Sequence, residues 1–138
     1  MRRRRKAIRG RFNKTVKNNH TYIYYRSCLE YSFINELESN PDVISYQYET
    51  LRIPYTSGRN NNQNHNYIPD FLVEYKNKTT SLIEVKPSNK LNRKKVKLKA
   101  IAARKWCKER SIIYIFITEK DLKHRYNKDL RKIKNDTR

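Results

Sequence analysis

The chain has 138 residues, a mean hydropathy of −1.07 and a formal charge of +20, from 33 Lys and Arg against 13 Asp and Glu. This length suits one domain, and no apolar run approaches the roughly 20 residues of a membrane-spanning helix or resembles the apolar part of a secretion signal. The two distant cysteines, Cys28 and Cys107, argue against a disulfide scaffold and a Cys-ligated zinc site, and the 36% apolar content argues against full disorder.

The positive charge is concentrated at the two ends of the chain. Residues 1–11 contain seven basic residues and no acid, and residues 86–138 contain 19 basic and five acidic residues, whereas the middle is nearly neutral. A positive field of this strength favours a polyanion, so we expect a nucleic acid as partner. The alternative source of the charge is a composition rich in Lys, Asn, Ile and Tyr, as AT-rich coding produces.

The first half of the chain predicts an arm, a helix and two strands. We expect residues 1–20 to form a flexible basic arm, residues 21–126 the folded domain and residues 127–138 a basic tail. Residues 27–39 predict a helix because Leu29, Phe33 and Leu37 repeat on one face. Strands are expected over 43–48 and 51–55, followed by a polar loop over 57–66.

The second half predicts a hairpin, a long helix and a last strand. Residues 67–75 and 79–86 form the hairpin around a turn at 77–78, and residues 90–110 form a basic helix. A continuous apolar strand follows at 111–117, and a short helix begins near residue 118 and extends to about 125. The order α-β-β-β-α-β-α predicts the α/β (α+β) class, with a mixed sheet flanked by helices.

The acids of the hairpin are its most informative residues. With the turn at 77–78, Asp70 lies opposite Glu84 or Val85, where directly opposed Cβ atoms are about 4.5–5.5 Å apart. Glu84 and Lys86 are two positions apart and share one face of their strand. Two carboxylates this close repel each other unless a cation lies between them, so we expect Asp70, Glu84 and Lys86 to converge at one end of the sheet.

Oxygen ligands of this kind suit Mg²⁺ (or Mn²⁺), with the carbonyl of Val85 as a further ligand. Phosphodiester hydrolysis uses such an ion to polarise a phosphoryl oxygen and to lower the pKa of a water molecule. A neighbouring lysine, here Lys86, can orient the attacking water or stabilise the transition state. The alternative is an ordinary cross-strand charge cluster on the surface, which the same residue pattern also allows.

Glu30, in the first turn of the predicted helix, has two possible uses. Ser27 and Glu30 have the spacing of a capping box, in which the glutamate bonds back to the amide of Ser27. The other use is as a further carboxylate of the metal site. The residue pattern alone favours the cap.

Several basic residues are candidates for DNA contact. Arg26 directly precedes the first helix, and His65 lies in the polar loop before Asp70, where a solvated loop histidine is the alternative. A cationic run that directly follows the hairpin predicts a surface that tracks phosphates: Lys90, Arg93, Lys94, Lys95, Lys97 and Lys99. Glu49 is considered only as a group that supports the site from outside it.

The hairpin YIPDF…LIEVK carries the signature of the PD-(D/E)XK nuclease superfamily, which has the restriction-endonuclease fold. Over residues 22–122, the chain resembles the tailed-phage head-completion nuclease family, in the segments YRSCLEYSFINELESNPDVISYQYETLRIPY, NYIPDFLVEY and RKWCKERSIIYIFITEKDL. It is also similar to the TnsA-type transposon-end endonuclease, which has a glutamine at the place of Glu84 and a C-terminal partner-binding domain. Because this chain lacks both features, we favour the phage family.

The resemblance implies an αβββαβ core and a metal-dependent DNA endonuclease. By position, it assigns Asp70 and Glu84 as metal ligands, Glu30 as an accessory acid of the metal site and Lys86 as the catalytic lysine. It also implies a role in head completion and DNA packaging, with DNA and phage portal or capsid proteins as partners. We expect a monomer or weak homodimer in the host cytoplasm during phage assembly or in the virion. The rival hypotheses are a structural head-completion protein without activity and a TnsA-like endonuclease.

Overall fold

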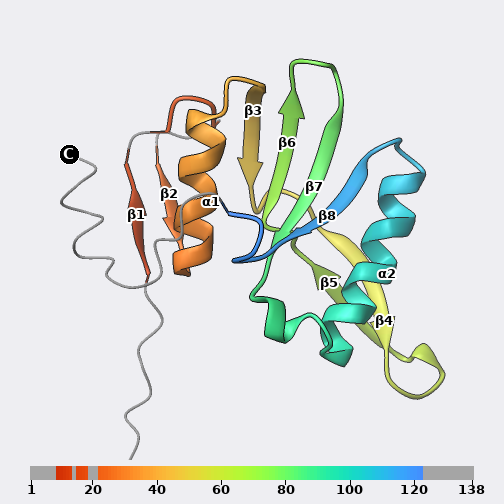
Figure 1. Ribbon diagram of the computed structural model, residues 1–138. Helices are drawn as coiled ribbons and strands as arrows, with labels where there is room; N and C mark the ends of the chain where they lie inside the picture. The colour runs from red at the N-terminus through yellow and green to blue at the C-terminus, as the bar shows by residue number, and fades with distance from the viewer. Residues whose placement is uncertain (1–8, 14, 19–21, 123–138) are drawn as a thin grey trace, which may run out of the picture.

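The computed structural model describes residues 9–13, 15–18 and 22–122 (Figure 1). Within these ranges the largest sheet has the strand order β3–β6–β7–β8, formed by Val43–Tyr48, Phe71–Tyr75, Thr80–Val85 and Ile113–Ile117. β6 is antiparallel to both β3 and β7, whereas β7 and β8 are parallel. A parallel pair needs a crossover connection, and helix α2 (Lys94–Lys108) provides it.

The two helices lie on opposite faces of this sheet. α1 (Cys28–Ser39) packs on one face, and α2 packs on the other beside a hairpin of β4 (Ile53–Ser57) and β5 (Gln63–Tyr67) (Figure 1). This hairpin is inserted between β3 and β6. Without it the order is α1-β3-β6-β7-α2-β8, so the predicted α/β (α+β) class and restriction-endonuclease-like αβββαβ core are confirmed.

Strand β7 divides its side chains between two apolar cores. Ile83 and Val85 point to the α1 side, where they join Ile34 and Phe71. Leu82 points to the α2 side and packs against residues that include Ala103 and Cys107. Because both faces of β7 are covered, this strand is buried along nearly its whole length, and its carboxyl end is held at a fixed position.

The described part of the N-terminal segment is folded, which differs from the arm expected over residues 1–20. β1 (Gly10–Phe12) pairs antiparallel with β2 (Ile23–Tyr25), and β2 buries Ile23 and Tyr25 against α1. The many charged residues of this segment make the short apolar pattern of these two strands hard to recognise in the sequence. The domain boundaries at residues 21 and 126 remain predictions, and the tail 127–138 lies outside the described residues.

The polar segment before Asp70 also differs from its prediction. Four of the ten residues of the expected loop at 57–66 belong to strand β5, which the 3-10 turn η1 (Arg59–Asn61) precedes. The strand expected over 67–75 is broken, since β5 ends at Tyr67 and β6 begins at Phe71. Pro69 lies in this break, and proline has no N–H for a strand ladder.

The other elements have nearly the predicted positions. α1 and β8 agree closely with residues 27–39 and 111–117, but the basic helix is shorter, because the 3-10 turn η2 (Ser88–Lys90) precedes it. Residues 119–121 form a turn in which the Asp121 carboxylate accepts from the N–H of Thr118, and the expected helix beyond 122 lies outside the described residues. Neither described helix has the length and apolar character that crossing a bilayer would require.

A matched pair of isoleucines tests the α1 core. Ile34 on α1 is 0% exposed, whereas Ile101 on α2 is 63% exposed. We expect Ile34→Ala to lower the free energy of unfolding by about 2–5 kcal/mol, because it leaves a cavity in a closed core. Ile101→Ala should change it by about 0.5 kcal/mol or less. Urea unfolding measures both, and equal effects of the two variants would contradict the described packing.

Candidate active site

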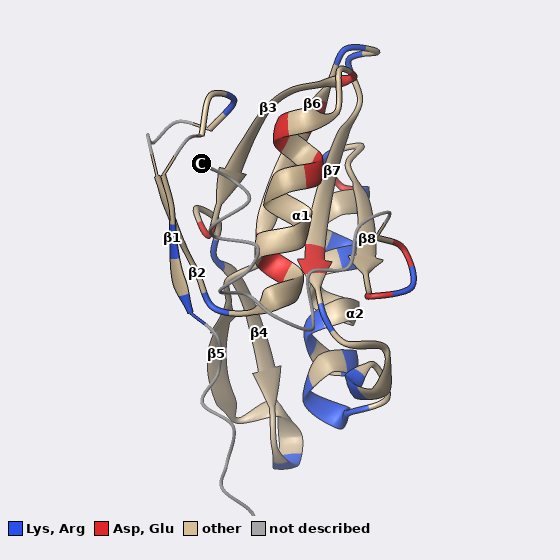
Figure 2. Ribbon diagram, turned by 60° about the vertical axis from the view of Figure 1, so that its left-hand side comes forward, with Lys and Arg blue, Asp and Glu red and all other residues tan. Residues whose placement is uncertain are grey.

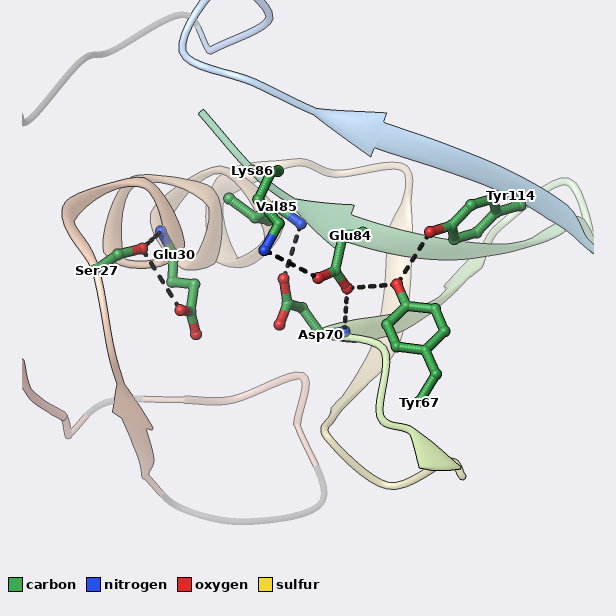
Figure 3. Close-up of polar contacts among 8 residues, drawn as sticks. All are labelled: Ser27, Glu30, Tyr67, Asp70, Glu84, Val85, Lys86 and Tyr114. Atoms are coloured by element: carbon green, nitrogen blue, oxygen red, sulfur yellow. Dashed lines mark hydrogen bonds and ion pairs between the residues drawn. The ribbon is translucent and has the colours of Figure 1, made fainter. Parts of the chain in front are cut away.

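The end of the β6–β7 hairpin brings Asp70 and Glu84 together. Phe71 pairs with Ile83, so the predicted register is confirmed, and Asp70 and Glu84 come next along each chain. The N–H of Val85 donates to Asp70 Oδ2 at 2.8 Å, and the N–H of Asp70 lies 3.3 Å from Glu84 Oε2. Each carboxylate is therefore fixed by the backbone of the opposite strand (Figure 3).

A tyrosine network holds Glu84 from behind. The hydroxyl of Tyr67 donates to Glu84 Oε2 at 2.6 Å and lies 3.0 Å from the hydroxyl of Tyr114 on β8. Lys86 lies beyond Glu84 on the same strand, and its Nζ is 3.9 Å from Glu84 Oε1 (Figure 3). The expected convergence of Asp70, Glu84 and Lys86 at one sheet end is thus present in the structure.

Glu30 supplies the backbone N–H that the N-cap residue Ser27 binds, and its side chain faces Asp70. Ser27 is the N-cap residue, and its Oγ accepts from the N–H of Glu30 at 3.1 Å. The Glu30 carboxylate accepts from the hydroxyl of Tyr48 on β3 and is directed toward Asp70 (Figure 3). The hydroxyl of Ser27 also lies 3.5 Å from Glu30 Oε2, so the Glu30 carboxylate contacts the cap residue with one oxygen and accepts from Tyr48 with the other.

Glu49 is a fourth carboxylate at this place. One carboxylate oxygen each from Glu30, Glu49 and Asp70 lies within 4.8 Å of the other two. Glu49 has a positive φ of 53°, which costs a residue with a side chain roughly 1–2 kcal/mol. In this conformation its N–H donates to the carbonyl oxygen of Asp70 at 2.9 Å. The unfavourable φ of Glu49 thus accompanies a hydrogen bond between the backbones of Glu49 and Asp70, two of the acids in this cluster.

These groups line one cleft of about 290 Å³, together with Arg26, Lys99 and Ile68. Lys99 comes from α2, and its Nζ lies 5.5 Å from the ring centre of Tyr67. The cleft contains four carboxylates (Glu30, Glu49, Asp70 and Glu84) and three basic side chains (Arg26, Lys86 and Lys99). In a chain of charge +20, this local excess of acid is a departure from the overall charge pattern.

Burial makes three acids of the cleft, Asp70, Glu84 and Glu30, hard to ionise. Burial, followed by the charges of Glu84 and Glu30, raises the pKa of Asp70 well above its ordinary value. The pKa of Glu84 is also raised by burial, against the hydrogen bond from Tyr67, and burial raises the pKa of Glu30 against the bond from Tyr48. Among the basic groups of the cleft, burial lowers the pKa of Lys99. A bound cation would relieve the repulsion among the acids.

The predicted DNA-contact residues lie at three different places. Arg26 lines the cleft, and its guanidinium forms a 3.1 Å ion pair with Glu49. His65 lies on β5, where its ring stacks on Tyr55 and its Nε2 is 2.6 Å from Ser57 Oγ, and it is not among the residues that line the cleft. The run Lys90, Arg93, Lys94, Lys95 and Lys97 lies at η2 and the first turns of α2, below the carboxyl end of β7 (Figure 2).

The fold and this site define a class of protein, the nucleases with a restriction-endonuclease-like fold. The model of one family in this class, the TnsA-like endonuclease N-terminal domain, matches residues 40–119. The match covers more than half of the chain, which therefore belongs to this family. It includes Asp70, Glu84 and Lys86 and begins after Glu30. No curated protein matches the chain.

Sequence reasoning gave too little weight to Glu49 and Lys99. Glu49 directly follows the end of β3 and belongs to no motif, and nothing local indicates its positive φ. The one signal in the sequence is the scarcity of acids in this chain. The sequence predicts Lys99 only as one member of the cationic run that contacts phosphates. Its place three positions after Val96 and one before the buried Ala100 indicates the helix side that faces the sheet.

Asp70→Asn tests the electrostatic strain of the cleft. The folded-state pKa of Asp70 is raised, so stability falls as pH rises from the ordinary carboxyl pKa toward the folded one. Asparagine keeps an acceptor for Val85 and removes the charge, so we expect Asp70→Asn to raise Tm by a few degrees at neutral pH without divalent ions. The gain should shrink as the pH approaches about 4, the ordinary value for an aspartate.

The exposed Asp42 provides the control, because Asp42→Asn removes one charge outside the cleft. Thermal unfolding of both variants between acid and neutral pH, followed by fluorescence, measures the difference. A loss of stability in Asp70→Asn at neutral pH, or a gain equal to that of Asp42→Asn, would contradict the described repulsion.

Proposed function

We propose that this protein is a divalent-metal-dependent DNA endonuclease that hydrolyses phosphodiester bonds in the cleft at the end of β7. One observation carries the proposal: the carboxylates of Glu30, Glu49 and Asp70 converge within 4.8 Å, beside Glu84 and Lys86. The family supports a nuclease, and the positive surface around the cleft suits DNA.

The donor set fits Mg²⁺ or Mn²⁺. All the candidate side-chain ligands are carboxylate oxygens, which these hard cations prefer, and no cysteine or histidine lines the cleft among the described residues. Asp70, Glu30, Glu49 and the Oε1 atom of Glu84 would hold the ion, with the carbonyl of Val85 as a further ligand. The bound ion would neutralise charge on the phosphate and lower the pKa of a water molecule.

The protein's own groups supply position and hydrogen bonds. Lys86 is only 30% exposed in its side chain, and its ammonium can donate to a phosphate oxygen or hold the attacking water in line. Lys99 brings a second ammonium to the cleft from α2. Tyr67 and Tyr48 keep Glu84 and Glu30 in one orientation, so that the acids need no rearrangement when substrate enters.

A plasmid-nicking assay in Mg²⁺ tests the endonuclease. Asp70→Ala should reduce the rate at least about 100-fold, since it removes a central ligand whose ion supplies several kcal/mol of transition-state stabilisation. Lys86→Ala should reduce the rate about 10²–10³-fold, as loss of one donor to the developing charge does. Asp42→Ala and Lys76→Ala alter the same residue types at exposed sites and should cut at the native rate.

The same assay separates the enzyme from the rival structural protein. Native protein that binds DNA and never cuts it in Mg²⁺ or Mn²⁺ would refute the enzyme and support a non-catalytic head-completion protein that binds DNA or the portal. Cutting that persists after chelation with EDTA would refute metal dependence alone.

For the biological setting, we propose processing of DNA at the phage head during completion and packaging. The supporting observations are the sequence resemblance over residues 22–122 and the carboxylate at Glu84. The alternative, a TnsA-like transposon-end endonuclease, is favoured by the family match and acts with a transposase partner. Cutting by the purified chain alone supports a self-sufficient phage nuclease, whereas activity that appears only with a transposase supports the alternative.

The basic surface at the start of α2 is testable by salt dependence. Lys94 and Lys95 are exposed in the first turn of α2, the helix that also brings Lys99 to the cleft. Changing both to glutamate should weaken binding to any DNA sequence alike and reduce the slope of log K against log salt by about 2. Lys76→Glu with Lys78→Glu gives the same net charge at the β6–β7 turn, the other end of the hairpin. Equal slopes for the two double variants would remove α2 from the DNA surface.

A further inference from the structure

A second groove continues from the cleft along the β1–β2 ribbon. It has a volume of about 790 Å³, and its walls include Arg9, Arg11, Tyr22 and Tyr24. Arg26 and Glu49 line both this groove and the cleft, so the two spaces meet at the ion pair between them. A polymer whose phosphate lies in the cleft can therefore extend into the groove.

The ribbon presents aromatic rings to this space. Tyr22 and Tyr24 are 40% and 60% exposed, are two positions apart, and have ring centres 5.3 Å from each other. Arg11 pairs with Tyr24 across the ribbon, and its guanidinium lies 4.3 Å from the ring centre of Tyr22. Two accessible rings with a cation beside them form a surface on which bases can stack while their phosphates meet arginine.

These exposed rings are not needed to attach the ribbon. Ile23 and Tyr25, the intervening residues, are 3% and 1% exposed and hold β2 against α1. The alternation leaves Tyr22 and Tyr24 on the outer side, where their rings contact each other and Arg11 and are not part of the core around α1. Their exposure therefore needs a different explanation from the core that anchors β2.

We propose that this groove binds an unpaired DNA strand that continues from the phosphate in the cleft. In a duplex, the faces of the bases are covered by their neighbours, so only an unpaired strand can offer them to Tyr22 and Tyr24. The arginines at positions 9, 11 and 26 supply the charge for its backbone. The substrate class is then DNA with a single-stranded segment next to the cut. This inference rests on the proposed nuclease function.

Fluorescence anisotropy in EDTA tests the groove without cleavage. The probes are a labelled blunt duplex and the same duplex with an unpaired extension. We expect the full-length protein to prefer the extended probe, and Tyr22→Ala with Tyr24→Ala to lose at least about fivefold in affinity for it, as loss of base stacking does. Binding of the blunt duplex should stay within about twofold, since the arginines of residues 1–11 are unchanged.

Two control variants isolate stacking from charge. Tyr22→Phe with Tyr24→Phe keeps both rings and should retain the preference. Arg11→Gln should weaken binding of the extended probe more than Arg59→Gln, which removes an exposed arginine on η1, outside the groove. Circular dichroism checks that the alanine variant keeps its fold, and the retained binding of the blunt duplex is a second check.

The outcomes separate this inference from the proposed function. Equal affinity of the native protein for both probes, or no effect of the alanine pair on the extended probe, would overturn the groove even if the protein cuts plasmid in Mg²⁺. A preference that depends on the tyrosines supports the groove even if no cutting is found, and in that case only the nuclease proposal fails.

Discussion

The site depends on a pair of crossed contacts at the end of the β6–β7 hairpin. Val85 donates to the carboxylate of Asp70, and Asp70 presents its own N–H to the carboxylate of Glu84. Each acid thus takes its position from the backbone of the opposite strand, and β7 is itself fixed between two cores. The remaining groups of the cleft, from α1, α2 and the segment after β3, converge on this hairpin end.

The part of the site that depends on local order could be predicted from the sequence. A turn placed near 77–78 limits the register of the antiparallel pair to two choices, with Asp70 opposite Glu84 or Val85. In the structure the turn spans residues 76–78 and Phe71 pairs with Ile83, so Asp70 comes beside Glu84. Likewise, the apolar repeat and Ser27 define α1, so the position of Glu30 in its first turn followed from the sequence. The resemblance was needed to direct its carboxylate to the cleft, because a cap and a ligand have the same spacing.

The rest depends on contacts between segments far apart in the chain. Glu49 enters the cleft with a positive φ, which a glutamate does not favour. In this conformation its N–H donates to the carbonyl oxygen of Asp70. The strands β1 and β5 have only three and five residues and polar or charged sequences, so their pairing partners, not their own propensity, make them strands. Local pattern cannot contain that information.

The distribution of charge connects the cleft with its surroundings. Four carboxylates in a small cleft cost stability, and in a neutral protein they would also repel the phosphates of DNA. Here the basic surface attracts the polyanion over a long range, whereas the acids act only over the few ångströms of the cleft, within the screening length of the solution. Arg26 lies between the acidic cleft and the basic surface, since it pairs with Glu49 and lines the groove of the β1–β2 ribbon. A strand that ran from the proposed groove into the cleft would pass this pair, and Arg26 would then exchange the Glu49 carboxylate for a phosphate while the acids bind a cation.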